Sequence, residues 1–168
     1  MKSDKNNSPL LNIRSDASDP RAQILSNLAH TPFKIGEYEF YSVESALQGI
    51  KFSDPKKQAK VFAMNGKDAL RSGREITFSI EDNKKFYVYW QGEKIEYNSD
   101  KHRLLIATFI HEKVRQNPEV QEALLATEGS FIFHDVGIEN PHTSLPEKFY
   151  IEVLLAERKL LKKLKSLH

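Results

Sequence analysis

The stretch YSVESALQGIKF, residues 41–52, places three polar side chains on one face of a predicted helix. At 100° per residue, Glu44, Gln48 and Lys51 fall within about 60° of arc. Leu47 borders this polar row on one side and Phe52 on the other. Because a solvated face has no such apolar borders, the row indicates a polar lining enclosed by the fold, or a chance arrangement on a short helix.

The residue types of the polar row suit a ligand that contains a sugar and a phosphate. Glu44 and Lys51 are separated by about 10 Å along the helix axis, which is too far for a tight ion pair. A carboxylate beside a sugar carbon and an ammonium beside a phosphate would fit a ribosyl phosphate or a dinucleotide. Spacing alone does not separate such a site from a half-exposed amphipathic helix, so both interpretations stay open at this point.

Composition limits the class of protein. The 168 residues, 39% of them apolar, are enough for one domain with a core. The formal net charge of +2 gives no global signature of a nucleic-acid-binding protein. The absence of cysteine excludes disulfides and thiolate metal sites and is typical of a reducing compartment, so we expect a cytoplasmic location. We expect neither a signal peptide nor a membrane partner, since no apolar run has the required length.

Other candidate sites in the sequence have simpler explanations. The six histidines show no i, i+4 pair that would bring two imidazoles onto one metal ion, and no glycine-rich phosphate loop is present. We therefore expect a site that uses no metal and no cofactor. The basic segment from Arg158 to Lys165 would suit phosphate contacts, but cations at the C-terminus of a helix explain it better.

The N-terminal residues differ in composition from the rest of the chain. Residues 1–22 are rich in Ser, Asp, Asn and Lys, which predicts a flexible arm before a single domain of residues 23–168. Residues 33–40 alternate around Gly36 as in a hairpin, and Ser42 can cap the helix that carries the polar row.

The rest of the chain is predicted to be mainly helical around one small sheet. Asp54 begins a helix, and a second, short helix is predicted to end at Gly73. Residues 76–97 hold alternating runs broken by EDNK and QGEK, which predicts a three-stranded antiparallel β meander. The later predicted helices cover residues 99–116, residues 117–129 and a last segment that opens with Ser144 and Glu147 at capping-box spacing. The predicted fold class is α+β, predominantly α-helical.

A longer motif, LSNLAHTPFKIGEYEFYSVESALQGIKFSDP over residues 25–55, resembles the opening motif of the NADAR family (NAD and ADP-ribose associated), also called YbiA-like. The matching residues are Leu25, Ser26, Asn27, Pro32, Phe33, Gly36, Glu44, Gln48, Lys51 and Phe52. The segments IATFIHEKVRQNPEVQEALLAT and YIEVLLAERKLL resemble later helices of the family. The resemblance covers about residues 24–161 and implies a YbiA-like single domain.

The sequence departs from the family pattern at several positions. Ser45 stands where many members have His, and Tyr97 and Asn98 stand near the position of a family Trp. The segment ENPHTSLPEKF replaces the family motifs that precede the last helix. Ring stacking by the missing Trp would pass to Tyr97 or to Trp90.

The resemblance implies a metal-independent N-glycosidase that hydrolyses the C1–N bond of a ribosylated heterocycle. The implied substrates are a ribosylamino-pyrimidine phosphate of the riboflavin pathway or ADP-ribose on guanine bases, so the partner is a small ribosyl phosphate, an ADP-ribose-type molecule or an ADP-ribosylated nucleic acid. As catalytic residues, Glu44 would stabilise the oxocarbenium-like centre and handle water, and Lys51 would hold phosphate or form a Schiff base. The implied substrate-binding residues are Asn27, Gln48, Phe52, Tyr97 and Asn98.

Two other functions also fit the sequence. A catalytically silent module that binds ADP-ribose or another NAD-derived ligand would explain the missing Trp and the altered segment before the last helix. An interaction protein would use the basic, amphipathic last helix. Release of free base during turnover separates the enzyme from both alternatives, and ligand binding without turnover selects the silent module.

Overall fold

The computed structural model describes residues 8–81 and 83–168, and within them the chain forms seven helices and six short strands. In chain order these are β1 (Leu10–Asn12), α1 (Pro20–Leu25), β2 (Phe33–Ile35), β3 (Tyr38–Phe40), α2 (Val43–Gly49), α3 (Pro55–Phe62), α4 (Gly66–Phe78), β4 (Tyr87–Trp90), β5 (Glu93–Glu96), α5 (Asp100–Gln116), α6 (Pro118–Ala126), β6 (Phe131–Phe133) and α7 (Glu147–Ser166). The predicted α+β class, with helix predominating, is confirmed. None of these helices is long and apolar enough to cross a membrane.

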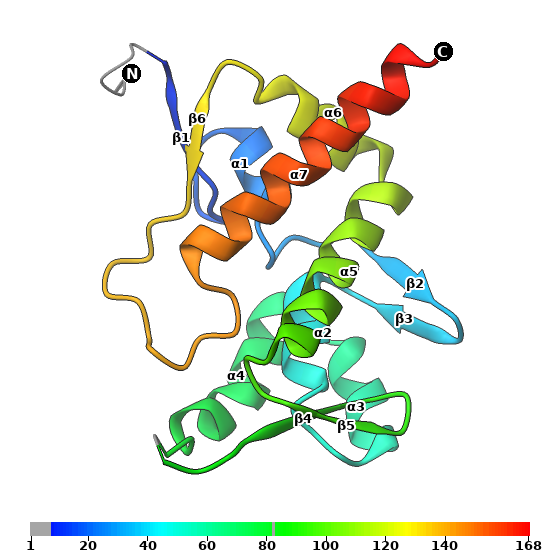
Figure 1. The fold of residues 1–168 in the computed structure, drawn as a ribbon, viewed down its shortest axis with the longest axis vertical. Helices are drawn as coiled ribbons and strands as arrows, with labels where there is room; N and C mark the ends of the chain where they lie inside the picture. Colours follow the sequence, from blue (N-terminus) through cyan, green and yellow to red (C-terminus); the bar gives the residue numbers. More distant parts are fainter. Residues whose placement is uncertain (1–7, 82) are drawn as a thin grey trace.

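The strands of the described residues pair in three separate two-stranded sheets (Figure 1). β1 and β6 are parallel, with Leu11 opposite Ile132, and β6 packs against α7. β2 and β3 form the predicted hairpin, and Gly36 takes a φ of 59° at its turn. β4 and β5 form a second antiparallel hairpin. The long-range β1–β6 pair therefore ties the start of the described chain to its last third.

Side-chain caps fix where several helices begin, as the sequence predicted. The Ser42 hydroxyl accepts a hydrogen bond from the Ser45 backbone N–H at 3.1 Å, which starts α2. Asp54 caps α3 ahead of Pro55, and Ser99 caps α5. Local capping chemistry therefore sets the start of the helix that carries the polar row.

Aromatic contacts attach both hairpins to α5, which runs through the middle of the molecule (Figure 1). The Phe109 ring of α5 lies 5.4 Å from the Phe40 ring of β3 and 5.4 Å from the Trp90 ring of β4. Phe33 stacks on Phe40 at 4.8 Å. These pairs bury large apolar areas and lock the relative orientation of the elements. Of the two residues considered for ring stacking, Trp90 therefore packs in this aromatic cluster and does not line the cavity described below, whereas Tyr97 does.

The predicted N-terminal arm is wrong for the residues that the structure describes. Residues 8–22 contain β1 and the start of α1, and Leu11 and Ile13 are buried in the core. The polar composition of this segment hid a short alternating strand whose partner, β6, lies about 120 residues further along the chain. Residues 1–7 of the predicted arm lie outside the described residues.

The segment after Gly73 is helical, so the predicted helix end at Gly73 and the predicted first strand of the meander are both wrong. α4 continues to Phe78, and the meander is the two-stranded β4–β5 hairpin. A Cβ atom at position 73 would lie 1.8 Å from Oε1 of Gln48. Gly73 therefore permits close approach of α4 to α2, and this tertiary contact overrides both the helix-stop signal and the strand propensity of the following residues.

The last helix begins later than the capping-box spacing predicted. α7 starts at Glu147 with Pro146 at the N-cap position. The predicted cap residue, Ser144, makes no side-chain capping hydrogen bond to this helix. Instead, the backbone N–H of Glu147 donates to Oε2 of Glu139 at 2.8 Å. A carboxylate from the preceding loop thus satisfies the helix N-terminus, where an anion is favoured.

The buried position of Ile13 predicts a large effect on stability. Ile13→Ala should lower the free energy of unfolding by about 2–5 kcal/mol, because it leaves a cavity against the core. Chemical denaturation followed by circular dichroism measures this change. The matched control is Ile138→Ala, which removes the same atoms from a fully exposed side chain and should change stability by less than about 0.5 kcal/mol. Equal effects of the two substitutions would show that β1 does not pack as described.

Candidate active site

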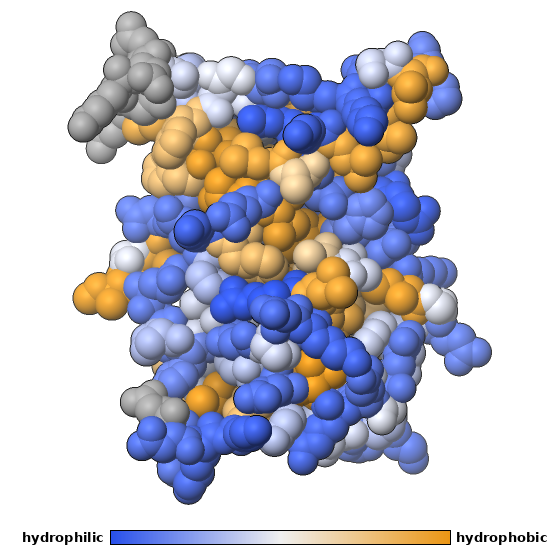
Figure 2. Space-filling view, in the orientation of Figure 1, coloured by the Kyte–Doolittle hydropathy of each residue, from blue (hydrophilic) through white to orange (hydrophobic). Residues whose placement is uncertain are grey.

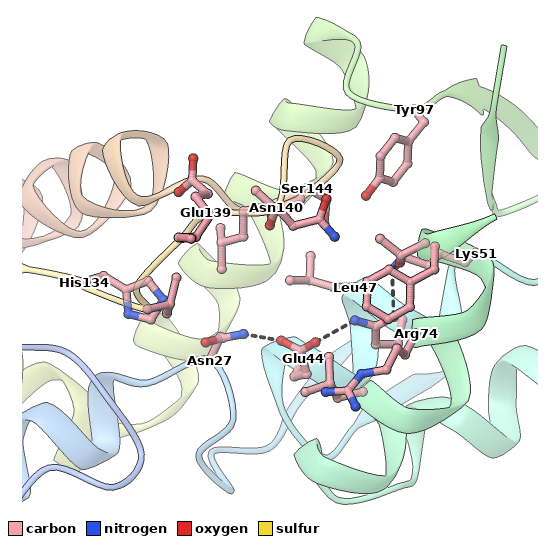
Figure 3. Close-up of a pocket in the computed structure, with 18 residues that line it drawn as sticks. Asn27, Glu44, Leu47, Lys51, Arg74, Tyr97, His134, Glu139, Asn140 and Ser144 are labelled. Carbon is pink, nitrogen blue, oxygen red and sulfur yellow. Dashed lines mark hydrogen bonds between the residues drawn. The ribbon is translucent and has the colours of Figure 1, made fainter. Parts of the chain in front are cut away.

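A cavity of about 400 Å³ lies between α2, α4 and the loop of residues 134–145 (Figure 3). Its walls are formed by Asn27, Glu44, Leu47, Gln48, Lys51, Leu70, Arg74, Thr77, Phe78, Tyr97, His134, Val136, Ile138, Glu139, Asn140, Thr143, Ser144 and Leu145. The size is within the range of sites for small molecules and cofactors. The cavity is therefore large enough for a ribosyl group with a substituent.

The polar row lines this cavity and is enclosed by the fold, with Glu44 and Gln48 on α2 and Lys51 in the turn directly after it. Glu44, Gln48 and Lys51 are each only 6% exposed, since α3, α4 and α5 pack around α2. Leu47, the apolar border of the row, is also buried and contributes to the cavity wall. The alternative of a half-exposed amphipathic helix is therefore wrong.

Hydrogen bonds join the polar row into one connected chain (Figure 3). Nε2 of Gln48 donates to Oε1 of Glu44 at 2.6 Å, and the amide of Asn27 donates to Oε2 of the same carboxylate. Nζ of Lys51 donates to Oε1 of Gln48 at 2.8 Å and also to the Thr77 hydroxyl on α4. Gln48 thus offers its donor to the anion and its acceptor to the cation, which separates the two charges by one amide.

Burial shifts the pKa values of both charged residues toward neutrality. Burial raises the pKa of Glu44, and the hydrogen bond from Gln48, the charge of Lys51 and the hydrogen bond from Asn27 oppose this rise. Burial lowers the pKa of Lys51 to about 8, against the opposing charge of Glu44. A carboxylate of raised basicity and an easily deprotonated amine are typical of sites that transfer protons.

The loop of residues 134–145 forms the wall opposite α2 and is anchored at both ends (Figure 3). Nδ1 of His134 lies 2.6 Å from the carbonyl oxygen of Ile13, the residue that follows β1. The Tyr97 hydroxyl donates to the carbonyl oxygen of His142 at 2.6 Å. Burial raises the pKa of Tyr97, which keeps this hydroxyl protonated as a donor. The wall therefore depends on parts of the chain that are far from α2 in sequence.

The mouth of the cavity is apolar and carries one cation. Phe78 is 69% exposed, Val136 is 52% exposed and Ile138 is fully exposed, although all three line the cavity. Figure 2 shows hydrophobic surface at the left edge of the molecule, where the loop of residues 134–145 bulges outward in Figure 1. Arg74, on the exposed side of α4, also lines the cavity. The site thus combines a charged floor with an apolar rim, an arrangement suited to a ligand with a planar ring.

Five of the residues predicted from sequence meet at this cavity, and two do not. Asn27, Glu44, Gln48, Lys51 and Tyr97 all line it.

The predictions for Phe52 and Asn98 are wrong in placement. Phe52 lies beyond the end of α2, where its ring faces Nζ of Lys57 at 5.3 Å. Asn98 has a φ of 59° in the turn before α5, and its backbone N–H donates to Nδ1 of His102 at 2.8 Å. Both residues lie in turns, after α2 and after β5, and neither is among the residues that line the cavity. The Asn98 side-chain amide instead donates to the carbonyl oxygen of Thr143, a residue of the cavity wall, at 3.3 Å.

Sequence reasoning missed several residues of the cavity, among them Arg74, Thr77, Phe78 and His134. Thr77 and Phe78 were assigned to a strand, and the loop that contains His134 has no periodicity to interpret. The available signal was Gly73, since a glycine inside a helix often marks close packing. Among residues 8–81 and 83–168, no group of three or more His, Asp or Glu side chains is arranged to hold a metal ion.

Comparisons with known proteins agree with this fold. The sequence matches the family model of bacteriophage protein GP30.3 over residues 20–159. It is 30% identical over 146 residues to the "uncharacterized 17.1 kDa protein in Gp30-rIII intergenic region" of Enterobacteria phage T4, and the match covers 86% of this chain and 93% of the phage protein. The fold is similar to the NMR structure of the E. coli protein YbiA, with a TM-score of 0.67 and 20% identity over 96% of this chain and 89% of YbiA. The predicted YbiA-like fold is thereby confirmed, and the chain belongs to the bacteriophage protein GP30.3 family.

Proposed function

We propose that the protein is an N-glycosidase that hydrolyses the C1–N bond of a ribosylated heterocycle. The observation that carries this proposal is the buried Glu44 carboxylate on the floor of the cavity, held by the amides of Asn27 and Gln48. Cleavage of a C1–N bond develops positive charge at C1, and a fixed anion in a water-poor site stabilises that charge. The sequence resemblance to the NADAR family and the YbiA-like fold support a glycosidase-type role.

The proposed reaction needs one carboxylate and one water molecule. The oxygen of water bonds to C1 while the C1–N bond breaks, and the electron pair of that bond leaves with the nitrogen of the base. Glu44 accepts the proton of the attacking water, and the released base takes up a proton. Each oxygen of Glu44 accepts one hydrogen bond from an amide, which leaves a further lone pair on each oxygen for water. Because burial raises the pKa of Glu44, this carboxylate is a better base than an exposed one.

The rest of the cavity suits the other parts of such a substrate. The cations of Lys51 and Arg74, which both line the cavity, would bind a phosphate on the sugar. The exposed Phe78 ring and Ile138 at the mouth suit the planar base, since stacking on aromatic side chains stabilises bases of any sequence. Two substrate classes fit this arrangement: a ribosylamino-pyrimidine phosphate and ADP-ribose attached to guanine. A screen of purified protein against both classes and NAD, with detection of free base and free sugar, tests the proposal.

A binding module without turnover is the second candidate. The observation that favours it is that both oxygens of Glu44 are already engaged by neutral amides in the described structure. If these amides exclude water from the carboxylate, the site holds an ADP-ribose-type ligand without cleaving it. Tight binding without release of base would select this function.

Substitution of Glu44 tests the chemical step. Glu44→Gln keeps the shape of the side chain but removes the anion, so ligand binding should persist while turnover falls by roughly 10²-fold or more. Isothermal titration and a base-release assay measure the two quantities. As a control in the same cavity, Glu139→Gln should change turnover by less than about tenfold, because Glu139 contacts the start of α7. Near-normal turnover by Glu44→Gln contradicts the assigned role.

Substitution of Lys51 separates phosphate binding from covalent catalysis. If Lys51 holds a phosphate, Lys51→Ala should raise KM most for a phosphorylated substrate and much less for its dephosphorylated analogue. A Schiff base would instead require Lys51 for turnover of both substrates, and borohydride would trap an adduct that mass spectrometry assigns to this residue. Lys57→Ala, at a half-buried cation of α3 that does not line the cavity, is the control. An adduct on Lys51 would overturn the phosphate-binding assignment.

The shifted pKa values predict how activity depends on pH. Lys51 has a pKa of about 8, so kcat/KM for a phosphorylated substrate should fall as the pH rises through about 8 and the ammonium loses its charge. A dephosphorylated analogue should lack this upper limb. The lower limb reflects Glu44, whose raised pKa makes activity fall as the pH decreases through that value. This lower limb is best measured with the dephosphorylated analogue, because the phosphate monoester of the other substrate itself titrates near pH 6. Identical upper limbs for both substrates would contradict the prediction.

A further inference from the structure

Residues 25–27, at the edge of the cavity, are held by donors from different helices. The bonds run from the Tyr150 hydroxyl of α7 to the Leu25 carbonyl, from Nζ of Lys113 of α5 to the Ser26 carbonyl at 2.8 Å, and from the Glu44 backbone N–H of α2 to the Asn27 carbonyl at 2.9 Å. Three consecutive carbonyl groups are thus each fixed by a separate helix. Leu25 ends α1, and Ser26 and Asn27 form the turn that follows it, so these three bonds tie the end of α1 to α7, α5 and α2.

The burial of Lys113 requires an explanation, because a buried ammonium is costly. Lys113 lies in the core of α5, and burial alone lowers its pKa to about 7. Its Nζ donates to the main-chain carbonyl of Ser26, which itself is buried. A methionine or leucine would fill the same space without this cost. The bond to residues 25–27 is therefore the feature that distinguishes Lys113 from an ordinary core side chain.

The held segment leads directly to the proposed catalytic carboxylate. Asn27 contacts Glu44 twice: its carbonyl accepts from the Glu44 backbone N–H, and its side-chain amide donates to Oε2 of Glu44. A displacement of the Asn27 backbone would therefore move the donor that orients Glu44. The position of this donor depends on the two preceding peptide groups, which Tyr150 and Lys113 hold.

We propose that Lys113 and Tyr150 are positioning residues, which hold residues 25–27 so that Asn27 orients the Glu44 carboxylate. The expected effect of these two residues on turnover rests on the proposed glycosidase function, whereas their effect on the Glu44 carboxylate does not. The effect is geometric for Lys113, because the charges that act on the pKa of Glu44 are those of Lys51 and His134. The charge of Glu44 does act on Tyr150: it adds to burial in raising the pKa of Tyr150. The Tyr150 hydroxyl therefore stays protonated and can donate its hydrogen bond.

Tyr150→Phe and Lys113→Met test this proposal, since each removes one donor and keeps most of the buried volume. The direct measurement is the pH titration of the Glu44 carboxyl carbon by NMR, assigned through its loss in Glu44→Gln. Weakening of the Asn27 hydrogen bond should move the Glu44 titration to higher pH, because that bond favours the ionised form. The other groups that act on Glu44, which are Gln48, Lys51 and His134, remain unchanged in both variants.

The expected kinetic effect is a fall in kcat of about tenfold or more with KM nearly unchanged, since orientation of the carboxylate matters most in the transition state. The matched controls are Tyr38→Phe, in the aromatic cluster of β3, and Lys101→Met, at an exposed position of α5. Both controls should leave the Glu44 titration and kcat as in the wild type.

An unchanged Glu44 titration in folded Tyr150→Phe protein overturns the proposal, even if Lys113→Met fails to fold. A titration that moves in Tyr150→Phe but not in the controls supports it. This readout needs no substrate, so it separates the two proposals. If the titration moves while the wild type releases no base from any substrate, the positioning role stands and the glycosidase function fails.

Discussion

Burial of two opposite charges, Glu44 on the seven-residue helix α2 and Lys51 in the turn directly after it, is the constraint on which the rest of the structure depends. Charged groups taken out of water destabilise a fold unless each finds hydrogen-bond partners. Glu44 and Lys51 meet this requirement through Gln48 between them and through Asn27 and Thr77 at the two ends of the chain. The partners come from α4 and from the segment after α1, so both must lie against α2.

This requirement explains the features of α4 that appear unfavourable in isolation. A glycine in the middle of a 13-residue helix costs helix propensity, yet any side chain at Gly73 would collide with Gln48. The close approach also brings Thr77 to Lys51, and it leaves Phe78 at the mouth of the cavity. The composition of α4 is thus set by the polar chain on α2 more than by its own helical stability.

The cavity is built from two kinds of chain segment. One part of the wall comes from residues 27–51, which lie close together in sequence, and from α4, which packs against them. The other part is an irregular loop that is held from a distance by Tyr97 and by the residue after β1. A rigid floor with an adaptable rim is a common division in binding sites, since loops can vary without loss of the scaffold. In this chain the floor carries the charges, and the rim carries the exposed apolar side chains.

The sequence by itself determined the local features: the caps at Ser42, Asp54 and Ser99, the hairpin around Gly36, and the polar row with its apolar borders. These depend on interactions within a few residues, which periodicity and capping chemistry describe well. Only the tertiary structure decided that β1 pairs with β6, that α4 continues past Gly73, and that the loop of residues 134–145 closes the cavity. Each of these depends on a contact between residues distant in the chain, and such contacts override local propensity because they bury more surface and satisfy more polar groups than the local alternative.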